Sequence, residues 1–254
     1  MFFDIETSYM EVTKIFRIGE QYIRADQIKK HSAIICVCWK FEGSEKIHSL
    51  KWDKGCDKDL IYKFVDIMND CDEVVGHNGD NFDIKWIRTR ALKHGIISMP
   101  DIKSIDTLKI SRSKLKLPSN KLDEIAKYFG LGKKIEHRGM PMWEEVIEDN
   151  SRKAMKEMVD YCKMDVELLE KIFLLLEGFA KPKTHAGMFM GADNCSCPYC
   201  GSEKTHYKQS RVSSNGTIKC QMLCYDKDCN KYFMVSLKAY NTRTKNKKSR
   251  RGRI

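Results

Sequence analysis

Two cysteine pairs near the C-terminus constrain the fold of this chain more than any other feature of its sequence. Two residues separate Cys197 from Cys200, and four separate Cys224 from Cys229. The 23 residues between the pairs include Asn215-Gly216, a dipeptide typical of a tight hairpin turn. Two cysteine knuckles joined by a hairpin are the pattern of a zinc ribbon, in which four thiolates hold one structural Zn²⁺. We therefore predict a small four-cysteine zinc-ribbon domain over residues 195–240.

The other cysteines leave two alternatives open for the ribbon. The chain has 11 cysteines, and six of them lie between Cys195 and Cys229. Cys195 and Cys220 are the expected spare thiols, although a ligand set that includes either one, or an iron–sulfur cluster, is an alternative. The odd count, and a strand-like N-terminus in place of a signal peptide, predict an intracellular protein without disulfides. We expect it in the cytoplasm of a bacterial or virus-infected cell.

Positive charge is concentrated in the C-terminal part of the chain. The net charge is +11; residues 184–254 hold 14 Lys+Arg and 4 Asp+Glu, a net of +10, which leaves +1 for residues 1–183. Such a distribution favours a nucleic-acid partner, with a solubilising role as the alternative. No apolar run approaches the length of a membrane span, so no membrane partner is expected. Residues 241–254 are predicted to form a basic disordered tail.

Several basic residues near the predicted hairpin are candidates for binding nucleic acid. They are Lys204, Lys208 and Arg211, with Lys219 close by. Each phosphate that they neutralise would release counterions and strengthen binding at low salt. The alternative is that the ribbon docks a protein partner.

The first 180 residues read as one α/β domain. Strands rich in β-branched residues come first, and strands and helices then alternate, which predicts a mixed sheet flanked by helices. Asp57 is a plausible N-cap, Thr7 to Lys30 is irregular, and residues 181–194 are predicted to be a linker. Strands are expected at residues 1–7, 32–43, 46–52, 73–78 and 104–110, and helices at 58–70, 82–95, 121–132 and 151–179.

Asp4 and Glu6 lie at the end of the apolar first strand. Residues i and i+2 of a strand share one face, so the two carboxylates are expected about 7 Å apart along the backbone. Like charges this close disfavour each other's ionised form unless a cation is present. Carboxylate oxygens suit Mg²⁺ or Mn²⁺. The pair therefore predicts part of a metal site, which needs further carboxylates from elsewhere in the chain.

Two later stretches supply further acids. Asp83 begins the helix that follows "VVGHNGDNF", with Asp80 as the alternative acid. Tyr161 and Asp165 are four residues apart on the long helix, so they share one face, about 6 Å from each other. Asp106, in "SIDT", is expected to cap or brace its segment rather than bind metal.

Three motifs, in this order, resemble the exonuclease motifs of the DEDDy 3′–5′ exonucleases. They are "DIET" at the start, "NGDNFD" in the middle and "YCKMD" on the long helix. The likeness is to the proofreading domain of family B DNA polymerases and covers roughly the first 178 residues. It implies a ribonuclease H-like fold, with a DEDDy exonuclease domain over residues 1–180.

The resemblance also implies residue roles. Asp4 would bridge two Mg²⁺ or Mn²⁺ ions, Glu6 and Asp165 would complete the site of the attacking water, and Asp83 would hold the ion near the leaving 3′-oxygen. Tyr161 would orient the water, and Asn78 and Phe82 match positions that contact or pack near the 3′ end. The sister subgroup has a histidine where this chain has Asp160. Only three residues precede Asp4, so the first strand is shorter than usual for the family.

The predicted function is metal-dependent 3′–5′ exonuclease activity, on single-stranded DNA rather than RNA. The alternatives are a ribonuclease, a structure-specific endonuclease, or a non-catalytic nucleic-acid-binding adaptor. A separate polymerase or a replication or repair protein is a candidate partner. His77 and His137 are expected to make local hydrogen bonds rather than to act in catalysis.

Overall fold

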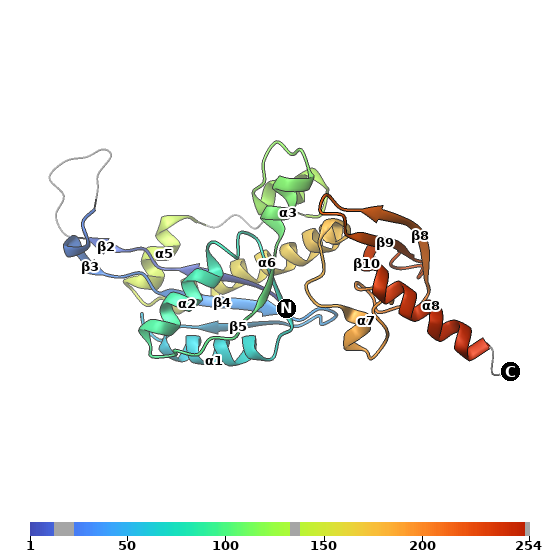
Figure 1. Ribbon diagram of the computed structural model, residues 1–254. Coiled ribbons are helices and arrows are strands. Elements are labelled where there is room, and N and C mark those ends of the chain that lie inside the picture. Colours follow the sequence, from blue (N-terminus) through green and yellow to red (C-terminus); the bar gives the residue numbers. More distant parts are fainter. Residues whose placement is uncertain (13–22, 133–137, 252–254) are drawn as a thin grey trace. The chain divides into compact units, whose positions relative to one another are not determined.

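The computed structural model describes residues 1–12, 23–132 and 138–251 of the chain. The chain divides into two compact units, Met1–Ala180 and Lys181–Ile254 (Figure 1). Within the described residues, every helix is too short or too polar to cross a membrane.

A five-stranded mixed sheet forms the centre of the first unit. Its strand order is β5-β4-β1-β6-β7. Strand β1 pairs antiparallel with β4, which pairs antiparallel with β5, whereas β6 and β7 continue the sheet parallel to β1. The strands are β1 (Phe2–Thr7), β4 (Ile34–Lys40), β5 (Ile47–Lys51), β6 (Glu73–Gly76) and β7 (Lys103–Asp106).

Helices cover both faces of this sheet, as the sequence predicts (Figure 1). Alternation along β1 sends Phe3 and Ile5 into the core under α1 (Lys58–Asn69) and α2 (Asp83–Lys93). Phe2 enters the core of the opposite face, under α5 (Met140–Ile147) and α6 (Arg152–Leu176). Each face of the strand therefore packs against its own helix layer.

Helix α6 is the longest element of the chain. The Ser151 hydroxyl caps its first turn by accepting the N–H of Ala154 at 3.3 Å. Its buried stripe packs on β1 and β4, and α4 (Leu122–Tyr128) packs on its second half through Ile125 and Ala126. A 3-10 turn, Glu177–Phe179, follows it.

Two segments of the first unit differ from their sequence predictions. The strand predicted at 104–110 ends at Asp106, because the Asp106 carboxylate accepts the N–H groups of Leu108 and Lys109 and so starts α3 (Thr107–Lys114). The stretch predicted to be irregular holds a short antiparallel pair that no sequence pattern indicated. Its elements are β2 (Glu11–Val12), a 3-10 turn (Ala25–Gln27) and β3 (Ile28–Lys30).

The second unit is built on a three-stranded antiparallel sheet in the order β10-β9-β8. Its strands are β8 (Thr205–Val212), β9 (Ile218–Cys224) and β10 (Tyr232–Ser236). The segment predicted to be a linker belongs to this unit and contains α7 (Ala186–Phe189). The N–H of Ala186 donates to the carbonyl of Pro198 at 3.1 Å, so the linker prediction is wrong: this segment packs on the first cysteine knuckle.

The prediction of a disordered C-terminal tail is also wrong for most of its length. Helix α8 spans Leu237–Arg251, and residues 252–254 lie outside the described residues. Arg243 anchors the helix: its Nη1 donates to the carbonyl of Cys195 and to the hydroxyl of Thr205, both at 2.7 Å, and its Nη2 donates to the carbonyl of Glu203 at 2.9 Å. Tertiary contacts thus order a segment whose composition alone would leave it unfolded.

A buried ion cluster joins α1, α2 and β4. Asp57 precedes α1, but its side chain makes no cap hydrogen bond. Instead, its fully buried carboxylate accepts two hydrogen bonds of 2.6 Å from Arg90, one of 2.7 Å from His94, and the N–H of Ile34 at 2.9 Å. Burial alone would raise the pKa of Asp57, but these hydrogen bonds hold it below its usual value.

We predict that Asp57→Ala lowers the free energy of unfolding by about 3–5 kcal/mol, because it leaves the Arg90 charge buried without a partner. Urea denaturation measures this, with the exposed, mid-helix Asp66→Ala as a control that stays within about 0.5 kcal/mol of the wild type. Because the pKa of Asp57 is lowered by folding, its contribution is present above the unfolded pKa of about 3.9 and is lost as the pH falls through the folded value. Equal stability of the two variants at pH 7 would contradict the prediction.

Candidate active site

Three of the predicted acids meet where β1 and α6 cross. Asp4, Glu6 and Asp165 each offer a carboxylate oxygen, and these oxygens lie within 4.8 Å of one another. Asp4 and Glu6 share a face of β1 with Phe2, and this face is turned toward α6. Asp165 is almost completely buried on the inward side of α6.

Two contacts fix the register of α6 on β1. The ring of Phe2 packs against that of Phe173 with centroids 5.4 Å apart, and the thiol of Cys162 donates to the carbonyl of Asp4 at 3.4 Å. The helix therefore runs antiparallel to the strand. Asp165, one turn after Cys162, faces the same stretch of β1, and its carboxylate lies within 4.8 Å of those of Asp4 and Glu6.

Asp83 lies beside the same strand but outside the group of three. Strand β6 pairs with β1 only through Phe2 and Val75, so the N–H of Ile5 has no strand partner on that side. The Asp83 carboxylate accepts this N–H at 3.2 Å and substitutes for the missing strand. Burial raises the pKa of Asp83 to about 7, against the opposing effect of its hydrogen bonds from the N–H groups of Asp83 and Ile5.

A tight turn leads from β6 to Asp83. A Cβ at Gly76 would lie 3.0 Å from the Cα of Gly79, so a side chain at this position would push the two arms of the turn apart by a few tenths of an ångström. Asn78 has a φ of 67°, its N–H donates to Asp106 at 3.0 Å, and its carbonyl accepts the N–H of Phe82, also at 3.0 Å. The geometry of this turn sets where α2 begins and hence where Asp83 lies.

The remaining candidates near the acids have distinct environments. The ring of Phe82 is 40% exposed and meets Trp86 edge-on. Tyr161 is buried on α6, one turn before Asp165. Asp80, the alternative to Asp83, pairs with Lys109 at 2.6 Å and accepts the hydroxyl of Ser104.

A group of three buried thiols behind the acids was not anticipated from the sequence. Cys36 and Cys38 on β4 face Cys162 on α6, and all three are completely buried. Burial raises the pKa of Cys162 well above its usual value, so this thiol remains a neutral donor to Asp4. The alternation of Cys36 and Cys38 placed them on one strand face, but only the tertiary structure reveals the third member.

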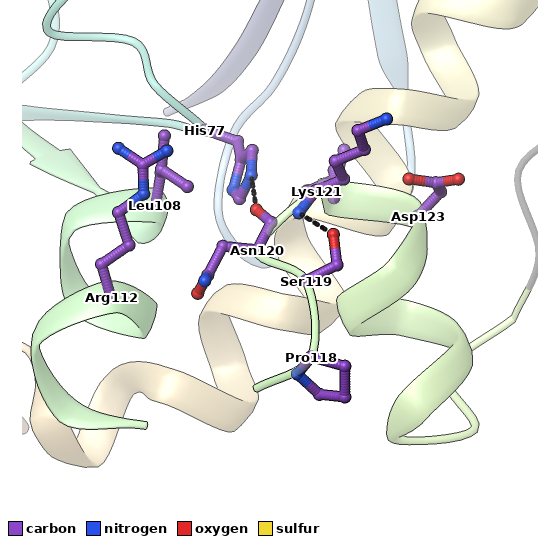
Figure 2. Close-up of a pocket in the computed structure, with 9 residues that line it drawn as sticks. His77, Leu108, Arg112, Pro118, Ser119, Asn120, Lys121 and Asp123 are labelled. Atoms are coloured by element: carbon purple, nitrogen blue, oxygen red, sulfur yellow. Dashed lines mark hydrogen bonds between the residues drawn. The ribbon is translucent and has the colours of Figure 1, made fainter. Parts of the chain in front are cut away.

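A pocket of about 610 Å³ lies between α3 and the start of α4 (Figure 2). Arg112 and Lys121 give it two cationic side chains, and Asp123 gives it one acidic side chain. His77 makes local hydrogen bonds, as predicted: its Nδ1 lies 2.9 Å from the Thr107 hydroxyl and its Nε2 lies 2.9 Å from the Asn120 carbonyl. His137, for which the same prediction was made, lies outside the described residues.

The acidic group fits a hard divalent cation. All of its donors are carboxylate oxygens, the ligands that Mg²⁺ and Mn²⁺ prefer. Three carboxylates this close to one another repel when they are ionised, and a cation between them removes that cost. Asp4, Glu6 and Asp165 would hold the cation. Asp83 lies beside the same strand, where its carboxylate accepts the N–H of Ile5.

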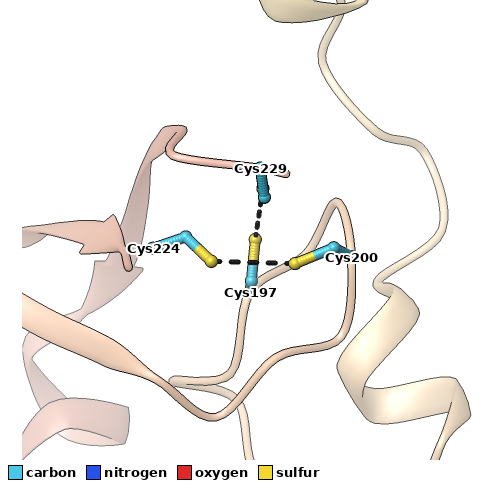
Figure 3. A group of neighbouring side chains, drawn as sticks. All are labelled: Cys197, Cys200, Cys224 and Cys229. Atoms are coloured by element: carbon cyan, nitrogen blue, oxygen red, sulfur yellow. Dashed lines mark hydrogen bonds between the residues drawn. The ribbon is translucent and has the colours of Figure 1, made fainter. Parts of the chain in front are cut away.

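The four predicted zinc ligands come together in the second unit (Figure 3). Cys197 and Cys229 have sulfur atoms 3.6 Å apart, and those of Cys200 and Cys224 are 3.7 Å apart. A tetrahedral ion with Zn–S bonds of about 2.3 Å needs sulfur atoms about 3.8 Å apart. The sulfur spacing therefore fits one Zn²⁺, as expected for a zinc ribbon.

The spare thiols and the basic candidates also have definite positions. Cys195 and Cys220 are buried in the core of the second unit and are not members of the four-sulfur group. Lys204 precedes β8, and Lys208 and Arg211 lie on it; all three are exposed.

A family model described as the RNase_H superfamily matches residues 1–176. The chain belongs to the RNase_H superfamily. This membership confirms the predicted ribonuclease H-like fold, which the mixed sheet between two helix layers shows directly. Membership of the RNase_H superfamily also supports a nuclease activity in general terms.

Two similar proteins are polymerases. Over 100 residues, 39% of its length, the chain is 33% identical to a DNA polymerase III PolC-type protein of Ureaplasma parvum serovar 3, of which it covers 7%. The structure of the family B DNA polymerase from the archaeon Pyrobaculum calidifontis matches 70% of the chain with a TM-score of 0.51 and 18% identity, and the match covers 24% of that polymerase. This RNase_H-superfamily chain thus spans only a small part of either polymerase.

We predict that the chain purified without chelator carries about one zinc per molecule, measured by elemental analysis. Cys224→Ser should lose the zinc and unfold the second unit, because binding the metal supplies most of the folding free energy of such a module. Cys56→Ser, at an exposed cysteine of the first unit, is the matched control and keeps the zinc, as does Cys220→Ala. Zinc-free protein with a folded second unit would contradict the assignment, and zinc loss in Cys220→Ala would favour the alternative ligand set.

Proposed function

We propose that this member of the RNase_H superfamily is a metal-dependent 3′–5′ exonuclease that hydrolyses single-stranded DNA. The observation that carries the proposal is the convergence of Asp4, Glu6 and Asp165 within 4.8 Å at the crossing of β1 and α6. A site of this kind suits a pair of Mg²⁺ or Mn²⁺ ions, which activate water and neutralise charge on the phosphate. The finer points of direction, substrate and mechanism rest on the resemblance of the three motifs to the DEDDy exonucleases.

The proposed roles rest on the resemblance of the three motifs, and the grouping of the acids supports them. Asp4, Glu6 and Asp165 would hold the cations. By the resemblance, Asp4 would serve both of them, and Glu6 and Asp165 would serve the one that activates the attacking water. Asp83 would support the cation near the leaving 3′-oxygen, while its hydrogen bond from the N–H of Ile5 keeps it beside β1. Tyr161 would orient the attacking water by a hydrogen bond from its hydroxyl.

The surroundings of the acids suit the end of a single strand. The half-exposed ring of Phe82, at the start of α2, offers a face on which a terminal base can stack. Asn78 holds the turn before it by accepting the N–H of Phe82. Arg112 and Lys121, in the pocket between α3 and the start of α4, offer positive charge to phosphate groups. A polymerase, or a replication or repair protein, is a proposed partner.

We predict that Asp4→Asn and Asp165→Asn each lower the rate of nucleotide release at least roughly a thousandfold, since each removes a charged ligand that acts on the reacting phosphate. Tyr161→Phe should cost about tenfold, the effect of one orienting hydrogen bond. Release of nucleotide from a 3′-labelled single strand, at fixed Mg²⁺ or Mn²⁺, measures each rate.

Glu167→Gln is the matched control, because Glu167 is an exposed carboxylate on another face of the same helix; it should retain the wild-type rate. Activity of Asp4→Asn and Asp165→Asn equal to that of Glu167→Gln would refute the proposed catalytic group. The same assay on 5′-labelled DNA, on duplexes and on RNA separates an exonuclease from an endonuclease or a ribonuclease. No degradation of any substrate would leave the adaptor alternative.

A further inference from the structure

The sheet of the second unit has one covered face and one open face. Along β10, Phe233 and Val235 are buried in the core with Met222 of β9. The residues that alternate with them, Tyr232 and Met234, are 55% and 42% exposed. The open face is therefore the side of the sheet opposite the ribbon core, defined by the residues of the three strands that alternate with the buried ones.

Aromatic rings gather at one end of the open face. The register places Tyr232 of β10 and His206 of β8 on either side of Leu223 of β9, whose own side chain is buried between its neighbours. Tyr225 follows two residues after Leu223 on the same side of the chain, and its ring meets that of His206 edge-on with centroids 4.5 Å apart. Tyr225 and Tyr232 remain about half exposed, so their ring surfaces are open to a ligand.

Positive charge accompanies the rings. The register of β8 and β9 shifts between Tyr207 and Gln209, and this irregularity redirects Lys208. The Lys208 ammonium lies 5.1 Å from the centre of the Tyr225 ring and donates to the Tyr225 hydroxyl at 2.7 Å. Further along the sheet, Arg211 of β8 is aligned with Lys219 of β9. None of the described residues of the three strands is acidic.

We infer that this open face is a base-stacking platform for unpaired nucleic acid, an inference that rests on the proposed function for the identity of the polymer. Aromatic rings attract the exposed faces of bases, and cations along the same surface attract the phosphates between them. From Lys219 to Tyr225 the face extends about 20 Å at roughly 3.3 Å per residue, enough for a few nucleotides. A duplex hides its base faces, so it would engage only the cations.

Charge complementarity argues for this occupant over a protein. The described residues of the three strands include no carboxylate, but they include Lys208, Arg211 and Lys219. Their charge is therefore complementary to a polyanion. Gln209 and Gln221 separate the aromatic row from the cationic row, and the Gln209 amide donates to Gln221 at 2.7 Å. The middle row thus holds two polar side chains beside Met234 of β10, so the face is not the continuous apolar surface that docks a protein segment.

Binding should be tested on the full chain carrying Asp165→Asn, so that the strand is not degraded. Fluorescence anisotropy with labelled oligothymidine and with a duplex of the same length gives the affinities and their salt dependence. On this background, Tyr225→Ala and Tyr232→Ala should each weaken single-strand binding about tenfold and leave duplex binding and the salt slope unchanged. Tyr128→Ala, at a 62% exposed tyrosine of the first unit, is the matched control and should change nothing.

A second pair of variants separates phosphate binding from stacking. Lys219→Gln and Arg211→Gln should weaken single strands and duplexes alike, and should reduce the salt slope by about 0.7 for each single-strand phosphate that is no longer neutralised. An oligomer with abasic sites should bind the Asp165→Asn parent as weakly as oligothymidine binds the tyrosine variants on that background. Zinc content and thermal unfolding equal to those of the parent show that each variant is folded.

Two results would overturn the inference that the open face is a base-stacking platform. One is unchanged single-strand affinity in the folded Tyr225→Ala/Tyr232→Ala double variant, which would leave a protein partner for this face. The other is an equal loss of affinity for single strand and duplex, which would mean that the rings only support the strands. The base-stacking inference and the proposed function are tested separately. Suppose that the chain releases no nucleotides from any substrate but still binds unpaired strands more tightly through Tyr225 and Tyr232. That result would refute the proposed nuclease activity alone.

Discussion

The packing of α6 against β1 is the interaction on which the rest of the first unit depends. The Phe2–Phe173 contact and the bond from the Cys162 thiol to the Asp4 carbonyl set the position of the helix along the strand. A shift of one helical residue would turn Asp165 by roughly 100° away from Asp4 and Glu6. The completely buried Cys36, Cys38 and Cys162 lie at this crossing, where their small side chains allow the helix to approach closely. The packing of the core between α6 and β1 therefore also sets the relative positions of the Asp4, Glu6 and Asp165 carboxylates.

The sequence predicts those parts of the structure that depend on local pattern. Period-2 alternation indicated that Asp4 and Glu6 share a face, helical spacing paired Tyr161 with Asp165, and cysteine spacing indicated the four-sulfur group. Where tertiary contacts outweigh composition, the predictions were wrong. The segment 181–194 and the start of the basic tail are ordered by hydrogen bonds to distant backbone carbonyls, as with Arg243 and Cys195, and no local pattern encodes such bonds.

Other features could not be predicted because they require the register of strands far apart in the sequence. The row that joins Tyr232 to His206 exists only once β9 is placed between β10 and β8. Asp57 shows the same limit in another form: its position before α1 suggested a cap, whereas its carboxylate binds Arg90 of α2, His94 at the end of α2 and the N–H of Ile34 of β4. A charged guanidinium is a stronger hydrogen-bond partner for a carboxylate than the neutral N–H groups of its own helix.

The anchoring of α8 by Arg243 changes how much conformational freedom its basic residues would lose on binding a polyanion. A flexible arm sweeps a large volume but loses conformational freedom each time it is captured. Beyond Arg243 the chain instead continues as a helix to Arg251, a rod about 12 Å long at 1.5 Å per residue. Such a rod has a shorter reach, yet its backbone is already ordered before any encounter. Over Arg243–Arg251 the backbone would therefore lose little further conformational freedom on binding a polyanion.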